Sequence, residues 1–250
     1  GLVAPAATAY SAGEGQSVEV VVTRSGASLD RALSLSYLTE LGTAGAADFT
    51  PLTGTLAWAP GDPAQKTITL PLSADTLAEG PETFTLRLSN LSGPATFPAS
   101  DPEQTVTLTI QDHPFDQWRH ERFASEANLP IAQPAADYDR DGVANLLEYV
   151  FQTDPLAATD PAVLPQAVIE EDRFGLRVVG QPAPGVRLEI QQSTTLTSWQ
   201  TVAHRAAGAG TWTVEDPGYV LHNGPLVGEI RLLALSGTAP LYLRLAAIRN

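Results

Sequence analysis

Apolar and polar residues alternate along three segments in the first part of the chain. Residues 67–72, 83–88 and 105–110 each place an apolar side chain at every second position. Such alternation buries one face of a strand and leaves the other in water. Residues 17–23, 33–38 and 54–58 are also strand-like, and clusters of Gly, Pro, Asp and Ser separate them. Six or seven short strands in about 110 residues predict an antiparallel sandwich.

The pattern changes after residue 112 and then returns to alternation. Phe115, Trp118, Arg122 and Phe123 have helical spacing, and residues 145–151 predict a second short helix that ends before Asp154-Pro155. Alternation resumes at 186–190 and 241–245. We therefore predict a mainly β protein: an immunoglobulin-like antiparallel sandwich over 1–112, a short helical segment over 113–160, and a second, smaller β-sandwich over 161–250.

The chain is acidic, and its charge is unevenly distributed. The net charge of −14 over 250 residues divides into −8 for residues 1–112, −6 for 113–162 and zero for 163–250. A negative surface repels nucleic-acid phosphates and anionic lipid heads, so neither is an expected partner, whereas a cation is. Cysteine is absent, which excludes disulfides and thiolate metal sites. No apolar run of about 18 residues is present, so we expect no membrane span.

One acidic motif has the spacing of an EF-hand-like calcium loop. Residues 137–148 place aspartate at positions 1, 3 and 5, glycine at 6, asparagine at 9 and glutamate at 12. The predicted metal ligands are Asp137, Asp139, Asp141, the Val143 carbonyl, Asn145 (directly or through water) and Glu148. We expect Gly142 to permit a sharp bend that a Cβ atom would obstruct.

Calcium accounts for this motif better than the alternatives do. Ca²⁺ takes about six to eight oxygen ligands, whereas Mg²⁺ favours fewer protein ligands. Without a cation, four close carboxylates would repel one another and raise each other's pKa values. A solvated acidic loop is the other interpretation, but it has no need for glycine at position 6 together with glutamate at position 12. The segment resembles the calcium loops of dockerin-like and thrombospondin type 3 repeats, although only one such loop is present.

The first part of the chain also resembles a known family. The residues that carry the resemblance are 11–15, Thr43-Ala44, Ala47-Asp48-Phe49, 54–56, Pro60-Gly61, Asp75 to Phe84, and 109–112, in this order. Together they resemble the Calx-beta family, whose fold is an immunoglobulin-like sandwich that in some members binds calcium in loops at one end. The resemblance implies calcium ligands at Glu14, Asp48, Asp75, Glu79 and Asp112, with Glu82 as a weaker candidate.

Two departures from the family pattern reduce the expected number of ions. Calcium-binding members have consecutive aspartates at two places, but here Ala74 precedes Asp75 and His113-Pro114 follows Asp112. We therefore expect one or two ions in this domain. A plain sandwich with solvated acidic loops is the alternative.

These patterns favour a non-catalytic calcium-binding module with a structural or adhesive role. We expect it to belong to a larger secreted or cell-surface bacterial protein, with calcium making loops and domain junctions rigid. A chain that begins at Gly1 without a signal peptide is consistent with a mature or excised fragment. Expected partners are calcium and other protein domains or surface and matrix components. An enzyme is not expected, since the chain has neither a Gly-x-Ser-x-Gly elbow nor a phosphate-binding Gly-rich loop.

Two alternatives remain open at this stage. Aromatic residues in the last part of the chain can form either a core or a sugar-stacking platform, and the latter would make the chain a carbohydrate-binding accessory module of an extracellular enzyme; these residues are Trp199, Trp212, Tyr219 and Tyr242. In a filament-forming subunit, the apolar stretch 1–10 would be a strand donated to a neighbouring copy.

Overall fold

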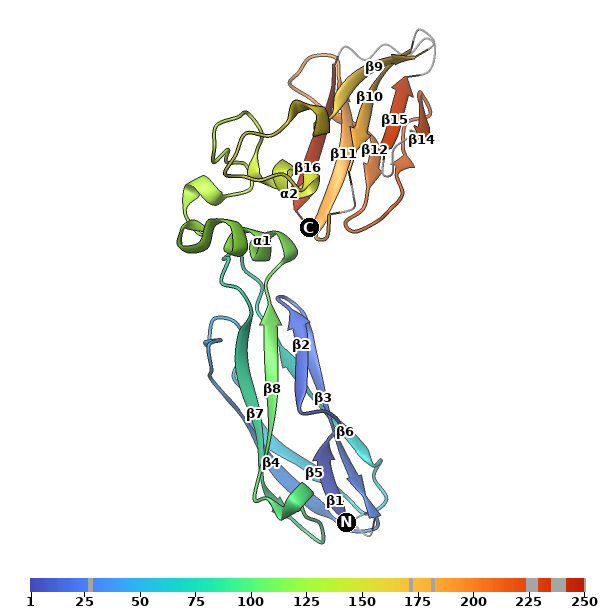
Figure 1. Cartoon of the computed structure of the whole chain (residues 1–250). Coiled ribbons are helices and arrows are strands. Elements are labelled where there is room, and N and C mark those ends of the chain that lie inside the picture. Colours follow the sequence, from blue (N-terminus) through green and yellow to red (C-terminus); the bar gives the residue numbers. More distant parts are fainter. Residues whose placement is uncertain (27–28, 171–172, 181–182, 224–228, 235–241, 250) are drawn as a thin grey trace. The chain divides into compact units, whose positions relative to one another are not determined.

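The computed structural model confirms the predicted mainly β class (Figure 1). It describes residues 1–250 except 27–28, 171–172, 181–182, 224–228, 235–241 and 250. The chain forms two compact units, Gly1–Gln117 and Trp118–Asn250. In the described residues, no helix combines the length and apolarity needed to cross a membrane.

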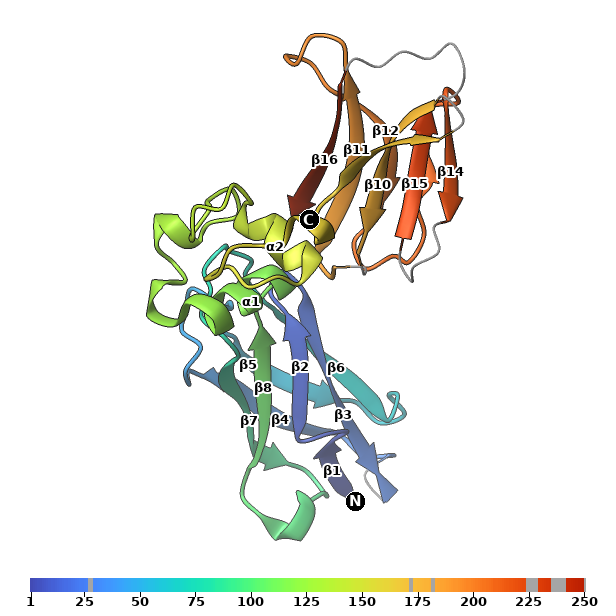
Figure 2. The ribbon, with the colours of Figure 1, turned by 45° about the horizontal axis from the view of Figure 1, so that its top comes forward.

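The first unit is a sandwich of a three-stranded and a five-stranded sheet (Figures 1 and 2). The strand order is β1-β3-β6 in one sheet and β2-β8-β7-β4-β5 in the other. The strands are β1 (Leu2–Pro5), β2 (Ala9–Gly13), β3 (Ser17–Ser25), β4 (Leu33–Glu40), β5 (Thr53–Trp58), β6 (Gln65–Pro71), β7 (Glu82–Ser92) and β8 (Gln104–Gln111), with a short 3-10 helix at Pro98–Ser100.

The alternating segments bury the residues that the sequence pattern selects. Phe84, Leu86 and Leu88 of β7 are at most 1% exposed, and the intervening side chains are only partly buried. Phe84 lies opposite Leu108 across the antiparallel β7–β8 pair, and its ring stacks on Phe49 with centroids 3.8 Å apart. These contacts join the 41–52 loop to the core.

The N-terminal stretch pairs with both sheets of its own unit. β1 is antiparallel to β3, and the Val3 side chain is fully buried. β2 runs parallel to β8, so the sandwich contains one parallel pair where we predicted antiparallel strands throughout. The stretch 1–10 is therefore placed within its own unit in this structure.

The second unit contains helical segments and two four-stranded sheets. α1 (Pro114–Phe123) begins in the first unit and ends in the second, and α2 (Asn145–Phe151) lies beside β16 (Figure 2). Short 3-10 helices occur at Ala124–Glu126, Pro130–Ala132 and Pro161–Val163. The sheet orders are β14-β15-β10-β9 and β13-β12-β11-β16.

The strands of the second unit lie where alternation predicted them, with additions. They are β9 (Gln166–Glu170), β10 (Arg173–Val179), β11 (Val186–Ser193), β12 (Gln200–Arg205), β13 (Thr213–Val214), β14 (Tyr219–Asn223), β15 (Glu229–Ala234) and β16 (Tyr242–Arg249). Residue 241 of the predicted strand 241–245 lies outside the described residues.

Two of the four aromatic residues considered as a sugar platform belong to the core. Tyr219 is 4% exposed, and its hydroxyl donates to Gln192 Oε1 at 2.7 Å. Trp212 packs against the same core. Tyr242 is 41% exposed, and Trp199 lies against the Arg244 guanidinium at 4.1 Å. The four residues therefore do not form one exposed surface.

The buried leucines of β7 make the stability of the first unit sensitive to truncation. We expect Leu86→Ala to destabilise this unit by about 2–5 kcal/mol, because it leaves a cavity among close-packed side chains. Leu38 on the neighbouring strand β4 is 39% exposed, so Leu38→Ala is the matched control and should have a small effect. Urea unfolding monitored separately for the two units measures both changes, and equal losses would contradict this description of the core.

Candidate metal centres

The first candidate centre lies where several strands of the first unit begin or end. β2 ends at Gly13, opposite Gln111 at the end of β8, and β7 starts at Glu82, opposite Ile110. The turn after β2 therefore meets the loop between β6 and β7. The backbone hydrogen bond from Gly15 N to Ser73 O at 2.9 Å joins the turn to this loop, and the bond from Glu14 N to Gln111 O at 3.0 Å joins the turn to the end of β8.

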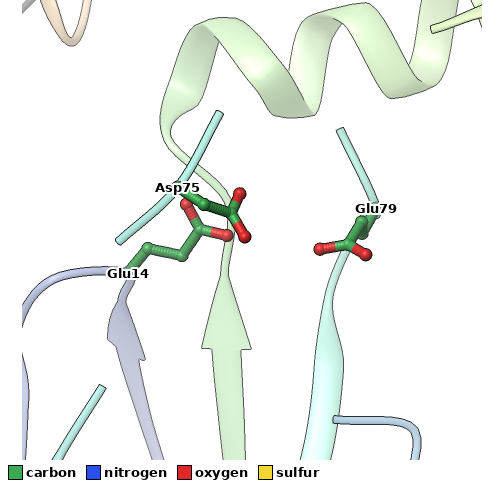
Figure 3. A group of neighbouring side chains, drawn as sticks. All are labelled: Glu14, Asp75 and Glu79. Carbon is green, nitrogen blue, oxygen red and sulfur yellow. The ribbon is translucent and has the colours of Figure 1, made fainter. Parts of the chain in front are cut away.

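Five of the predicted acidic residues form two overlapping groups at this end. Carboxylate oxygens of Glu14, Asp75 and Glu79 lie within 4.8 Å of one another (Figure 3). The carboxylate oxygens of Asp48, Glu79 and Glu82 form a second group, also within 4.8 Å of one another. Glu79 is shared, so the two groups form one continuous acidic surface.

Asp112 supports the cluster from the end of β8. Its side chain is 7% exposed, and Oδ2 accepts hydrogen bonds from Glu79 N at 3.0 Å and Gly80 N at 2.9 Å. These bonds attach the β6–β7 loop to the last strand. Asp112 is thus close to the predicted ligands but is already engaged with backbone donors through one oxygen.

The close approach of like charges changes how these groups titrate. Burial, followed by the charges of Asp75 and Asp112, raises the pKa of Glu14 to about 7. Burial and the neighbouring aspartates also raise the pKa of Glu79 and of Glu82. Folding therefore holds these carboxylates close together at an electrostatic cost that a bound cation would remove.

Asp116 is an acidic neighbour that the sequence analysis missed. It lies in the first turn of α1, its side chain is fully buried, and its charge contributes to the raised pKa of Glu14. Asp112 precedes α1, so helical spacing does not relate the two residues, and the sequence pattern held no signal for Asp116.

The second candidate centre is the 137–148 loop in the second unit. Carboxylate oxygens of Asp137, Asp139 and Asp141 lie within 4.8 Å of one another. Asp137 accepts hydrogen bonds from Arg140 N at 2.7 Å and Gly142 N at 2.9 Å, and Asp141 Oδ1 accepts from Val143 N at 2.7 Å. The aspartates thus shape the turn by bonding its own amides.

Gly142 occupies a backbone conformation that favours glycine. Its φ angle is +94°, which side chains of L-residues rarely adopt. A Cβ atom added there would meet nothing within 4 Å. The glycine is therefore explained by the backbone conformation of the bend, which a Cβ atom disfavours, and not by a lack of space around it.

Asn145 and Glu148 extend the loop into a buried helix, and both side chains are fully buried. Asn145 Nδ2 donates to Ile131 O at 3.0 Å and Gln133 O at 2.9 Å, which ties the start of α2 to the preceding segment. Val143, whose carbonyl is a predicted calcium ligand, is also buried, at 6% exposed.

Buried oxygen atoms at this centre lack partners. Among the described residues, Asp139 Oδ2, Asn145 Oδ1 and Glu148 Oε2 are buried and have no hydrogen-bond partner. Burial, then the charges of Asp139 and Asp141, raises the pKa of Glu148 to about 7. Unsatisfied buried oxygens are costly and rare. A set of ligands made only of carboxylate and amide oxygens fits a hard divalent cation such as Ca²⁺.

Comparison with known proteins supports the resemblance seen in the first part of the sequence. No curated protein matches the chain. Among solved structures, the apo form of the Calx CBD1 domain has 26% identity and a TM-score of 0.40, covering 44% of this chain and 96% of that one. The CBD12 structure from CALX1.2 has 17% identity and a TM-score of 0.43, covering 99% and 75%. The model of the Calx-beta domain family matches residues 6–114, which lie within the first unit.

Proposed function

We propose that this chain is a non-catalytic calcium-binding module with two separate ion centres. One centre is the acidic cluster of the first unit, around Glu14, Asp48, Asp75, Glu79 and Glu82, and the other is the 137–148 loop. The match of residues 6–114 to the Calx-beta domain supports the first. Calcium would neutralise the carboxylates that folding brings together, so that ion binding stabilises the folded state.

The observation that carries the proposal is the buried carboxylate of Glu148. It is fully buried, one of its oxygens has no partner among the described residues, and the charges of Asp139 and Asp141 act on it. A buried carboxylate without a counter-charge is expensive. A cation held by the loop aspartates and Glu148 removes that cost, which is the chemistry of an EF-hand-like loop.

The proposed role is structural. Calcium would make the loops of each unit rigid. Asp112 bonds the Glu79 backbone and the charge of Asp116 acts on Glu14, so an ion in the first centre would also stabilise the start of α1. We place the module in a larger secreted or cell-surface bacterial protein, where millimolar calcium suits modules with dissociation constants of about 10⁻⁴–10⁻³ M. A carbohydrate-binding role is not proposed, because Tyr219 and Trp212 pack in the core.

Calcium should raise the thermal stability of both units, and each variant should affect its own unit. At free calcium about 100-fold above the dissociation constant, one site contributes about 2.7 kcal/mol. We expect Asp141→Ala to remove most of the calcium-dependent rise in Tm of the second unit. Glu79→Gln should do so for the first unit, because Glu79 belongs to both acidic groups. Differential scanning calorimetry in calcium and in chelator measures this, with each variant in chelator as its own reference. A wild-type Tm that is the same in both conditions would contradict the proposal.

The stability of the calcium-free protein should fall as pH rises from about 5 to about 7.5. Glu14 and Glu148 have pKa values raised to about 7 by burial and neighbouring acids. In this window the folded state holds protons that the unfolded state has released, so its stability decreases with rising pH. The lowered pKa of Asp62, Asp141 and Glu189 acts at lower pH and does not oppose this trend.

Saturating calcium should abolish or reverse this pH dependence, because the ion keeps the carboxylates ionised. Glu14→Gln should reduce the fall in chelator for the first unit, whereas Glu19→Gln, at an exposed position on β3, should leave it unchanged. Denaturant unfolding across this pH range tests both statements. Stability that rises with pH in chelator would contradict the raised pKa values of Glu14 and Glu148.

A further inference from the structure

The chain after α2 turns back toward the 137–148 loop. Gln152 has a φ angle of +57°, in the left-handed region, and ends the helix. Thr153 N then donates to Glu148 O at 3.0 Å. The segment Thr153–Asp160, here called the return segment, therefore starts against the residue that closes the loop.

Thr159 of the return segment contacts two of the predicted calcium ligands. Its backbone N–H donates to Asp141 Oδ2 at 2.5 Å. Its hydroxyl donates to Glu148 Oε1 at 3.4 Å and lies 3.3 Å from Thr153 Oγ1. Asp141 therefore receives one donor from inside the loop, Val143 N, and one from outside it.

These contacts orient ligand oxygens before an ion arrives. The N–H of Thr159 fixes one oxygen of Asp141, and it is the main cause of the lowered pKa of that carboxyl. The hydroxyl holds Glu148 Oε1, while Oε2 has no partner among the described residues. Groups that hydrogen-bond to metal ligands orient them and commonly affect affinity about 10- to 100-fold.

We propose that the return segment is a second part of the calcium site, in which Thr159 positions Asp141 and Glu148. This inference rests on the proposed function of the loop. Because these contacts connect the loop to a segment that follows it in the chain, an ion bound by the loop orders the return segment as well. The return segment leads into the 3-10 helix Pro161–Val163 and then into β9. Bound calcium therefore orders the residues that immediately precede the second β-sandwich.

Hydrogen exchange of the full chain tests the coupling and separates it from the proposed function. Peptides covering 137–148 and 153–160 are followed in chelator and in calcium, and we expect both to gain protection. Protection of 137–148 without any gain at 153–160 would overturn this inference and leave the proposed function standing. Absence of protection at 137–148 would overturn the proposed function itself.

Substitution of Thr159 tests its positioning role. The calcium concentration that gives half-maximal protection of peptide 137–148 reports the affinity of this centre alone. We expect Thr159→Ala to raise that concentration roughly tenfold, at the lower end of the range for a group that hydrogen-bonds to a metal ligand, because the bond to Glu148 is long at 3.4 Å. Thr159→Ser retains the hydroxyl and should restore the wild-type value.

Thr201→Ala is the matched control. The Thr201 hydroxyl also donates to a carboxylate of the second unit, Glu189 Oε2 at 2.7 Å, but Thr201 lies on β12 and its substitution should leave the midpoint unchanged. An unchanged midpoint in Thr159→Ala, or an equal change in Thr201→Ala, would overturn the positioning role.

Discussion

The mutual repulsion of carboxylates held at short distance is the constraint on which both candidate centres depend. Three carboxylate oxygens lie within 4.8 Å of one another in each acidic group. In the structure this repulsion is partly offset by backbone donors, such as those on Asp137 and Asp112. It is also relieved by proton uptake, since the pKa values of Glu14 and Glu148 are raised to about 7. A divalent cation offers a third route, and it would also give the unpartnered oxygen of Glu148 a partner.

The two centres reach the same chemistry by different constructions. In the second unit the three aspartates come from one turn, and the positive φ of Gly142 makes the turn possible. In the first unit the acids come from separate loops, and the register of β2, β7 and β8 brings those loops to one end of the sandwich. A local motif therefore brings the aspartates of one centre together, whereas the acidic residues of the other meet only when the whole sandwich has folded.

This difference explains how much could be predicted from the sequence. The alternation in 83–88 and 105–110 predicted β7 and β8 because a half-buried strand needs only that pattern. The spacing of Asp137, Asp139 and Asp141 was sufficient for their convergence. The grouping of Glu14 with Asp75 and Glu79 came instead from the resemblance to the Calx-beta family. Thr159 had no sequence signal, since its role depends on the chain reversal after α2, and the parallel pairing of β2 with β8 follows from tertiary packing of a short strand.

The number of protons released when calcium binds tests the central claim most directly. Calorimetric titration of the full chain at about pH 6.5, in buffers of different ionisation enthalpy, measures this number together with stoichiometry. Carboxyls with pKa values of about 7, namely those of Glu14 and Glu148, are largely protonated at that pH and must ionise to bind the ion. The account predicts net proton release that disappears by about pH 9. Calcium binding without proton release, or no binding at all, would contradict it.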